Sequence, residues 1–529
     1  MLFRLLSLIL LFTAAAWAQG DSLSLSPAAG ADQGTVSLNL LLNSAGGQQP
    51  AGVQWTLTYS SVDFTAIVVT AGPSAVAAGK TVTCAGNSSA YKCLVVGVNR
   101  DTIADGVLAV ISLTVSPSTL DTTSFIQIQN ALGVSLGGAP IAVSTTGSSA
   151  TITPATGVSP SALFVPVSPC RVADTRNADG SLGGPAIAGG ASRDFLIPDS
   201  SCGIPADAAA YSLNVTVIPQ RSLGFLTVWP TGQSQPGVST LNSPAGRITS
   251  NAAIVPAGAN GAITIFASDT TDVVLDINGY SIASSDTGAL AFYPLTPCRV
   301  VDTRGTAGLL GAPGLAAVST RSFPISEGPC DVPETARAYS LNFTATPKGS
   351  LSYLTVWPSG EPQPVVSALN DVTGIVTTNA VIVPAGANGD INVFATNATD
   401  LTIDTNGYFA APGTGGLSLY NLAPCRVLDT RQSGESPFHG TLEVTVSGTC
   451  GVPPAAQAYV LNVTVMPPGA FDYLSLGPHG AKPPAVPALN SVVGIASNLA
   501  IVPAANGAID AYASNPTHLI LDISGYFAP

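Results

Sequence analysis

The residues of this chain that are best suited to chemistry recur in one short sequence motif. PCRVADTR at residues 169–176 returns as PCRVVDTR at 297–304 and as PCRVLDTR at 424–431, in a chain of which only 9% of residues are charged. A guanidinium group beside a carboxylate forms a bidentate ion pair, which lowers the carboxylate pKa and leaves no proton to donate. The motif therefore favours a structural clasp over a catalytic acid. The predicted clasp residues are Arg171, Asp174, Arg176, Arg299, Asp302, Arg304, Arg426, Asp429 and Arg431.

A second aspartate recurs near the end of each copy, as Asp276, Asp404 and Asp522. Two aspartates could form the carboxylate pair of a glycan hydrolase. However, each of these residues precedes Asn-Gly, Thr-Asn-Gly or Ser-Gly, where an aspartate accepts backbone N–H bonds in a turn. We therefore expect no enzyme, with an aspartate-based hydrolase as the alternative.

Histidine and glutamate do not supply a shared catalytic or metal site. The three histidines all lie in the third copy, and the glutamates all follow residue 320. The D-x-N-G words resemble the start of a calcium loop but lack its later ligands. No cofactor and no metal are expected, with calcium as the alternative.

The eight cysteines predict disulfides, because each copy holds two and no histidine recurs to complete a zinc site. The predicted pairs are Cys84 with Cys93, Cys170 with Cys202, Cys298 with Cys330, and Cys425 with Cys450. A bridge closing a loop of about thirty residues contributes roughly 3 to 4 kcal/mol.

Trp229 and Trp357 are candidate ligand-binding residues, since an exposed indole suits the face of a sugar ring. The alternation of FLTVWP, and a glycine at the same position of the third copy, favour core packing instead. Asn214, Asn342 and Asn462 begin N-x-T sequons within predicted strands, and we expect them to be buried and hydrogen-bonded across a sheet.

Short segments rich in β-branched and aromatic residues, separated by Gly, Pro, Asn and Ser, predict an all-β protein. An arginine, an apolar run and the A-x-A pattern at residues 16–18 predict a signal peptide, and no later segment could form a membrane span. The expected organisation is a signal peptide at 1–18, a β-sandwich at 21–154, a linker at 155–162, and repeats at 163–283, 291–412 and 418–529. Repeats of this length can each enclose a core, so we expect β-sandwiches or barrels arranged like beads on a string.

The first module resembles the cohesin family. The words GVQWTLTY and DGVLAVISLTV carry this likeness, which implies a jelly-roll sandwich of the kind shared with carbohydrate-binding modules and, in cellulosomes, a dockerin partner. The three repeats, opening with CRxxDTR and closing with NGYF or a variant of it, resemble tandem modules in secreted proteins of actinobacteria and acidobacteria. That resemblance implies no settled activity.

A net charge of -13 argues against nucleic acid or an anionic membrane as the partner. We expect a secreted, extracellular or cell-surface protein that acts in adhesion by binding polysaccharide or a surface glycan through the cohesin-like module. The repeats would then be spacers or auxiliary binding modules. The alternative is a cohesin-type scaffold that binds a protein partner.

Overall fold

β-Strands make up nearly all of the regular structure, as the sequence predicted. The structure is a computed structural model, and the chain divides into two compact units, Met1–Val158 and Ser159–Pro529. The predicted signal peptide and most of the predicted linker lie outside the described residues. The structure describes residues 21–26, 35–44, 48–60, 63–88, 90–115, 123–151, 161–283, 288–432, 434, 436–490 and 494–529.

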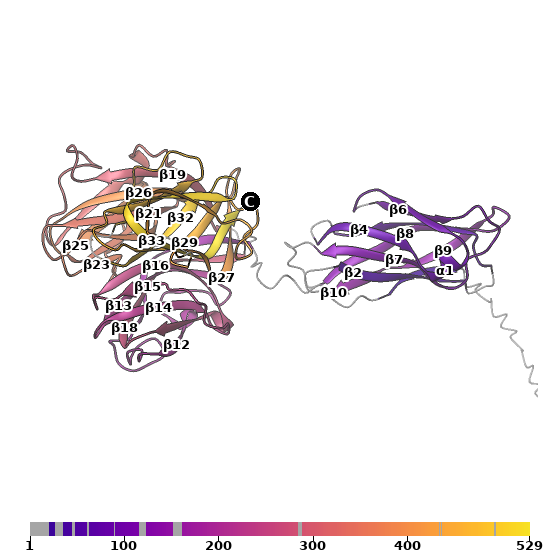
Figure 1. Ribbon diagram of the computed structural model, residues 1–529, viewed down its shortest axis with the longest axis horizontal. Helices are drawn as coiled ribbons and strands as arrows, with labels where there is room; N and C mark the ends of the chain where they lie inside the picture. Colours follow the sequence, from indigo (N-terminus) through magenta and orange to yellow (C-terminus); the bar gives the residue numbers. More distant parts are fainter. Residues whose placement is uncertain are drawn as a thin grey trace, which may run out of the picture. The chain divides into compact units, whose positions relative to one another are not determined.

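The first unit is a β-sandwich with one short helix (Figure 1). Its elements are β1 Asp21–Leu25, β2 Thr35–Asn43, β3 Gly52–Thr58, β4 Phe64–Ala71, α1 Pro73–Ala77, β5 Thr81–Ala85, β6 Tyr91–Val96, β7 Gly106–Val115, β8 Thr123–Val134, β9 Pro140–Thr146 and β10 Ser148–Thr151. The strands run in the order β4-β7-β2-β1-β9-β8-β3-β6-β5, with β10 paired to β8. Alternating leucines of β2 point into the core, where Trp55 of β3 is fully buried, as expected.

Each repeat of the second unit is a sandwich of two antiparallel layers of four strands, and one layer of the first repeat is continuous with one of the third, because Ala162 of β11 pairs with Leu419 of β27. The sheets that face the other repeats, here called the inner sheets, have the orders β16-β13-β18-β11, β24-β21-β26-β19 and β32-β29-β33-β27. The outer sheets have the orders β12-β17-β14-β15, β20-β25-β22-β23 and β28-β33-β30-β31. In the third repeat the single strand β33 serves both sheets.

Corresponding strands occur at corresponding positions of the three repeats, and 3-10 helices occur at corresponding positions of the first two. In the first repeat they are β11 Ala162–Asp174, β12 Ala191–Leu196, η1 Ile197–Asp199, β13 Ala210–Pro219, β14 Leu223–Pro230, β15 Leu241–Ser243, β16 Thr249–Pro256, η2 Ala259–Gly261, β17 Ala262–Ala267 and β18 Thr271–Ala283. In the second they are β19 Ala291–Asp302, β20 Ser319–Pro324, η3 Ile325–Glu327, β21 Ala338–Pro347, β22 Ser352–Pro358, β23 Leu369–Asp371, β24 Thr377–Pro384, η4 Ala387–Gly389, β25 Asp390–Ala395 and β26 Thr399–Ala410. In the third they are β27 Ser418–Asp429, β28 Phe438–Thr445, β29 Ala458–Met466, β30 Tyr473–Pro478, β31 Leu489–Asn490, β32 Ala496–Pro503 and β33 Ala508–Ala528.

The inner sheets are buried on both faces. One face closes the core of its own repeat, and the other packs into a common core that all three repeats supply. Strand β16 shows the pattern, since Ala253 and Val255 face the repeat's own core while Ala252 and Ile254 face the common core. The centre of the common core is aromatic, with ring centroids 4.5 Å apart for Phe292 and Phe527, and 4.6 Å, 5.1 Å and 6.4 Å for the pairs of Phe409 with Phe164, Phe292 and Phe527.

The expectation of beads on a string is wrong for the repeats. They form one compact unit, in which the first contacts the second, the second contacts the third, and the third contacts the first. The physical reason lies in strands such as β16, whose two apolar faces cannot both be buried within one repeat. A head-to-tail interface that returns to its starting copy closes a ring, here within a single chain.

Candidate functional site

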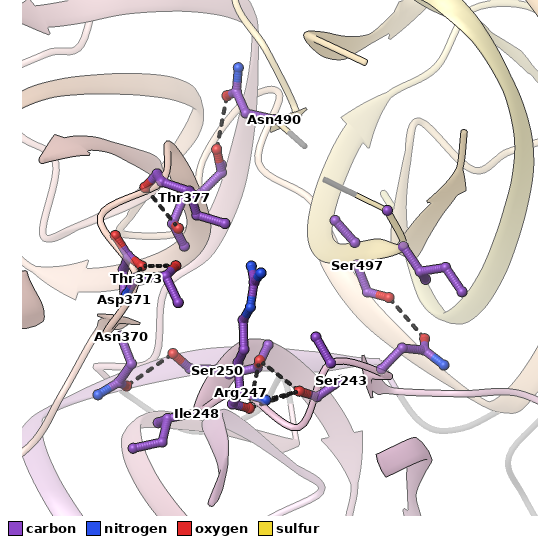
Figure 2. A pocket seen from close by; sticks show the side chains of 18 of the residues that line it. Ser243, Arg247, Ile248, Ser250, Asn370, Asp371, Thr373, Thr377, Asn490 and Ser497 are labelled. Atoms are coloured by element: carbon purple, nitrogen blue, oxygen red, sulfur yellow. Dashed lines mark hydrogen bonds between the residues drawn. The ribbon is translucent and has the colours of Figure 1, made fainter. Parts of the chain in front are cut away.

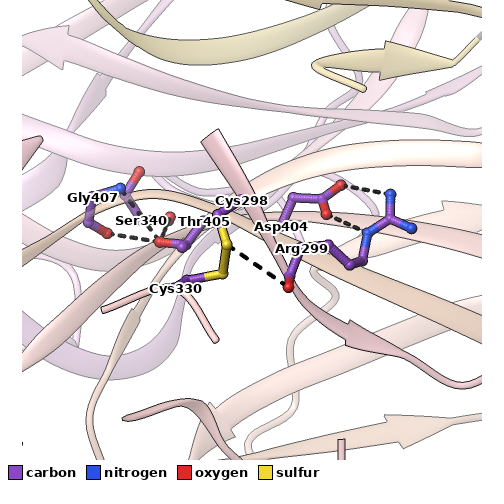
Figure 3. Close-up of a disulfide and its surroundings, with 7 residues drawn as sticks. All are labelled: Cys298, Arg299, Cys330, Ser340, Asp404, Thr405 and Gly407. Carbon is purple, nitrogen blue, oxygen red and sulfur yellow. Dashed lines mark hydrogen bonds and ion pairs between the residues drawn. A yellow bond between two sulfur atoms is a disulfide. The ribbon is translucent and has the colours of Figure 1, made fainter. Parts of the chain in front are cut away.

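The recurring motif folds as a clasp next to a disulfide. All four predicted cysteine pairs are bonded in the structure, and no described cysteine is free. Figure 3 shows the second copy, where Cys298 is bonded to Cys330 and the neighbouring Arg299 reaches Asp404. The disulfide therefore fixes the strand that carries the arginine.

Each clasp joins two arginines and two aspartates. In the first copy, Arg176 contacts both carboxylate oxygens of Asp174 at 2.8 Å and 2.6 Å, and Arg171 donates from Nη1 to Asp174 at 3.0 Å. Arg171 also forms a bidentate pair with Asp276, which lies directly opposite on β18. The same pairs form in the second copy, among Arg299, Asp302, Arg304 and Asp404, and in the third, among Arg426, Asp429, Arg431 and Asp522.

The arginines lower the pKa of the aspartate that lies within the motif of each copy, here called the outer aspartate (Asp174, Asp302 and Asp429). Hydrogen bonds from Arg304 lower the pKa of Asp302 to about 2, and hydrogen bonds from Arg431 lower the pKa of Asp429 to about 2. For Asp174, burial acts to raise the pKa, but the hydrogen bonds from Arg176 outweigh it and the pKa is lowered. These carboxylates are ionised and paired, as the clasp interpretation requires.

Asp276, Asp404 and Asp522, here called the inner aspartates, do not lie in turns as the sequence predicted, but within strands. Asp276 lies within β18, is 4% exposed, and accepts the backbone N–H of Ser367 from the second repeat at 3.2 Å. Burial raises the pKa of Asp276 to about 6 against the opposing bonds from Arg171, and the pKa of Asp404 is also raised to about 6 by burial. The position that corresponds to Ser367 in the third repeat is Pro487, which has no N–H to offer Asp404. Asp276 thus joins its clasp to the interface between repeats, and Asp522 does the same through the backbone N–H of Ser239.

Asn214, Asn342 and Asn462, which begin the N-x-T sequons, are buried or half-buried. The sequence predicted hydrogen bonds across a sheet, but these side chains form hydrogen bonds to a neighbouring repeat. Asn214 donates to the carbonyl of Ser367 at 2.6 Å. Its side-chain oxygen accepts the amide of Asn379 at 2.8 Å. Equivalent bonds run from Asn342 to Pro487 and from Asn462 to Ser239. These side chains hold the ring closed, so none of them is free to carry a glycan.

Trp229 and Trp357 are not exposed platforms. They are 5% and 4% exposed, and their indole N–H groups donate to the carbonyls of Gln233 and Glu361 at 3.0 Å. The reason is that the loop following each strand folds back over it, as the bond from Thr227 to the carbonyl of Val238 shows. In the third repeat, Gly477 replaces the tryptophan, and a Cβ there would lie 2.9 Å from the ring of Pro484.

A different aromatic residue of the same strands is exposed in part. Phe225, Tyr353 and Tyr473 each pair with an aromatic ring of the neighbouring strand on the outer face of the outer sheet. The pairs are Phe225 with Phe266 at 5.6 Å, Tyr353 with Phe394 at 6.2 Å, and Tyr473 with Tyr512 at 6.1 Å between centroids. The repetition of one aromatic pair in three copies makes it a candidate binding surface.

A groove brings one of these aromatic residues to a clasp. The groove lies between the first and second repeats, has a volume of about 660 Å³, and is lined by Arg171 and Arg176 on one side and by Tyr353 and Gln363 on the other. Tyr353 is 37% exposed, and the side chain of Arg176 is 51% exposed. The guanidinium charges are balanced by Asp174 and Asp276, so the groove presents planar polar groups and an aromatic ring without a large net charge.

A second hollow lies where all three repeats meet, and we call it the axial cavity. It has a volume of about 400 Å³, and the described residues that line it come from 242–250 of the first repeat, 370–378 of the second, and 489–490 and 494–497 of the third. Figure 2 shows Arg247 projecting into it, with hydroxyl and amide side chains around. Three hydrogen bonds ring the cavity, each from a hydroxyl of one repeat to an amide oxygen of the next: Ser250 to Asn370, Thr378 to Asn490, and Ser497 to Asn242.

Comparison with known proteins finds solved structures that are similar to about a quarter of this chain. No protein-family description matches the sequence, and no curated protein matches it. The cohesin–dockerin complex Coh-OlpA-Doc918 from Clostridium thermocellum contains a chain similar to this one, with 12% identity, 26% of this chain and 100% of that chain covered, and a TM-score of 0.24.

Two further solved structures are similar over the same share of this chain. A non-cellulosomal cohesin from the archaeon Archaeoglobus fulgidus has 13% identity over 26% of this chain and 92% of its own, with a TM-score of 0.21. A cohesin module from a family 33 glycoside hydrolase of Clostridium perfringens has 13% identity over 26% of this chain and 96% of its own, with a TM-score of 0.22. The resemblance of the repeats to tandem bacterial modules stays a prediction.

Sequence reasoning missed Tyr353 and Arg247. A signal for the first was present, because the leading position of FLTVWP, YLTVWP and YLSLGP is aromatic in all three copies, whereas the tryptophan is not. No recurring signal marked Arg247, since the other copies have Ile375 and Gly494 at that position.

Proposed function

We propose that this is a secreted, non-enzymatic protein that binds polysaccharide, acting in adhesion at the cell surface or outside the cell. The observation that supports this most directly is the groove between the first and second repeats, which the partly exposed ring of Tyr353 lines together with two arginines and Gln363. Aromatic rings flanked by planar hydrogen-bonding groups suit a pyranose ring, and the volume lies within the usual range for ligand sites. The balanced charge favours a neutral glycan.

This proposal moves the binding site from the first unit to the repeats. The aromatic pairs recur in all three repeats, so weak sites could act together on one polymer and raise the apparent affinity. The four disulfides are consistent with secretion into an oxidising compartment. In the part of the chain that the structure describes, no helix has the length and apolarity to cross a membrane.

The proposal treats the protein as non-enzymatic, and it is supported by the ion pairs in which arginine binds each carboxylate that recurs in all three repeats. A glycan hydrolase would need one of them as a protonated acid and another as a free base or nucleophile. Asp302→Asn tests this point. We expect lower stability and no change in any glycan-hydrolysing activity, whereas an intact fold with lost hydrolysis would establish the enzyme alternative.

The binding experiment uses the mature protein on insoluble polysaccharides and soluble glycans. Tyr353→Ala should weaken retention about tenfold, because loss of a stacked ring removes on the order of 1 kcal/mol or more. Leu309→Ala is the matched control, since Leu309 is an exposed apolar residue (68%) of the same repeat, away from the groove. Equal retention of both variants and the unsubstituted protein would remove the groove as the site.

A second candidate function, binding of a protein partner, is favoured by one face of the first unit. On the outward face of β3, β5 and β6, Leu94 and Val96 are 42% and 41% exposed and lie beside Gln54, Thr83 and Thr81. The same face carries the exposed Lys92 and otherwise presents apolar, hydroxyl and amide side chains, which suits a flat protein surface. Leu94→Asp should abolish capture of one identified partner by residues 21–154, whereas Phe125→Asp should not. A partner captured equally by both variants would reject this face.

A further inference from the structure

The three repeats contribute the same residue types to the wall of the axial cavity, but only the first contributes a cationic side chain among the described residues. Its wall repeats an asparagine and a hydroxyl residue from each repeat, joined in the ring of hydrogen bonds described above. These hydroxyls donate within the ring and keep lone pairs as acceptors. Apolar side chains, among them those of Ile248, Ile375 and Ile495, also line the cavity, so it offers both polar and apolar contacts.

Arg247 is the residue that breaks this threefold pattern. It stands four residues before Asn251, where the other repeats have Ile375 and Gly494. Its backbone bonds to the hydroxyl of Ser243, which holds the turn, whereas its guanidinium group has no hydrogen-bond or ion-pair partner in the described part of the chain. Figure 2 shows this side chain standing free in the middle of the cavity.

The carboxylate of Asp371 also lines the cavity, but no ion pair joins it to Arg247 in the described part of the chain. Its Oδ1 atom accepts three bonds, from the backbone N–H and hydroxyl of Thr373 at 2.8 Å and from the N–H of Gly374 at 3.1 Å. Its Oδ2 atom is shielded from solvent and has no partner among the described residues. Asp371 Oδ1 is therefore occupied by Thr373 and Gly374, whereas the guanidinium group of Arg247 is free to bind a ligand.

We propose that the axial cavity binds a sugar acid of the hexuronate type, with its carboxylate on Arg247 and its hydroxyls on the polar ring. A planar guanidinium fork matches a carboxylate in bidentate fashion. A volume of about 400 Å³ exceeds what an inorganic anion fills but suits a monosaccharide. The axial cavity adjoins the groove and shares Ile248, Asn370 and Val372 with it, but Arg247 lines only the cavity and Tyr353 only the groove, so substitutions at these two residues test the two proposals separately.

The test is titration calorimetry of the mature protein with sodium glucuronate, glucose and sodium acetate. Glucuronate should bind at least about tenfold more tightly than either of the others, because only it offers both the carboxylate and the hydroxyls. A trigalacturonate titration then separates the two sources of this chemistry. Tighter binding than the monosaccharide indicates the end of an acidic glycan, and equal or weaker binding indicates a free sugar acid.

Arg247→Gln should abolish the preference for glucuronate over glucose. Arg247→Lys, which keeps the charge but not the fork, should retain only part of it. The matched control is Arg221→Gln, an exposed arginine of the same repeat, which should leave the preference unchanged. Thermal unfolding of each variant shows that the ring is intact. Equal binding of glucuronate and glucose, equal binding of glucuronate and acetate, or an unchanged preference in a folded Arg247→Gln protein, would each overturn the proposal.

Discussion

The amide nitrogen of Asn379 donates to the side-chain oxygen of Asn214, 165 residues earlier in the chain, at 2.8 Å. The same amide nitrogen donates to the carbonyl of Ala368 at 2.6 Å, and the side-chain oxygen accepts the N–H of Ala252 at 3.0 Å. Asn379 is 1% exposed. One buried side chain thus satisfies polar groups of two repeats, and Asn251 and Asn498 do the same at the other two interfaces.

Asn379→Ala should destabilise the whole ring. The change leaves the oxygen of Asn214, the carbonyl of Ala368 and the N–H of Ala252 without their partners, and each buried unsatisfied group costs about 1 to 3 kcal/mol. We expect a loss of at least about 3 kcal/mol in the free energy of unfolding, measured by urea denaturation. Asn397→Ala, at an exposed position of the same repeat, should change it by less than about 0.5 kcal/mol. A loss limited to that of the control would show that these bonds do not hold the repeats together.

Deleting the third repeat should make the rest of the second unit insoluble or oligomeric. A chain ending at residue 412 would expose Phe292, Phe409 and Ile382, which now pack against the third repeat in the common core. Contiguous apolar surface of this kind drives association. Size-exclusion chromatography with light scattering checks the result, with the first unit alone as the soluble control. A monomeric, folded product would restore the beads-on-a-string arrangement.

Phe409→Ala should be among the most damaging single changes in the common core. The ring is 1% exposed and contacts Phe164, Phe292 and Phe527 from all three repeats. Truncating a buried phenylalanine costs about 3 to 5 kcal/mol, because the cavity that remains cannot fully collapse. Phe125→Ala, at a ring that is 69% exposed, should cost less than about 1 kcal/mol. Thermal and urea unfolding followed by circular dichroism give both values, and equal losses would contradict the assigned core.

The local features of this fold could be predicted from the sequence. Segments rich in β-branched residues predicted the strands, and the presence of two cysteines in each copy predicted the disulfides. The spacing of Arg171, Asp174 and Arg176 within one sequence motif predicted the bonds between them. These features depend on residues close together in the chain or repeated in register.

The arrangement of the repeats could not be predicted in the same way. The partner of Asp276 is Arg171, 105 residues away, and it is set by strand register. The burial of Trp229 was favoured by the sequence, but the loop that covers it could not be predicted. The axial cavity exists only because three repeats close a ring. One signal was present, because words such as NAAIVP are apolar at successive positions and so favour a strand buried on both faces.

Stability should fall as the pH drops below about 4, because of the outer clasp aspartates. The pKa of Asp302 and of Asp429 is about 2 in the folded protein, below the ordinary value of 3.8, so the stability they contribute is complete above about pH 4 and is lost as the pH falls toward 2. Asp276 and Asp404, with pKa raised to about 6, act in the opposite sense, and the stability they contribute declines as the pH rises from about 4 to 6. Urea midpoints measured from pH 7 to pH 2.5 should therefore drop most steeply below pH 4. Asp429→Asn should make that drop shallower, since the neutral amide cannot be protonated there. A midpoint that stays constant from pH 4 to 2.5, or an equally steep drop in Asp429→Asn, would show that the clasps do not carry the acid sensitivity.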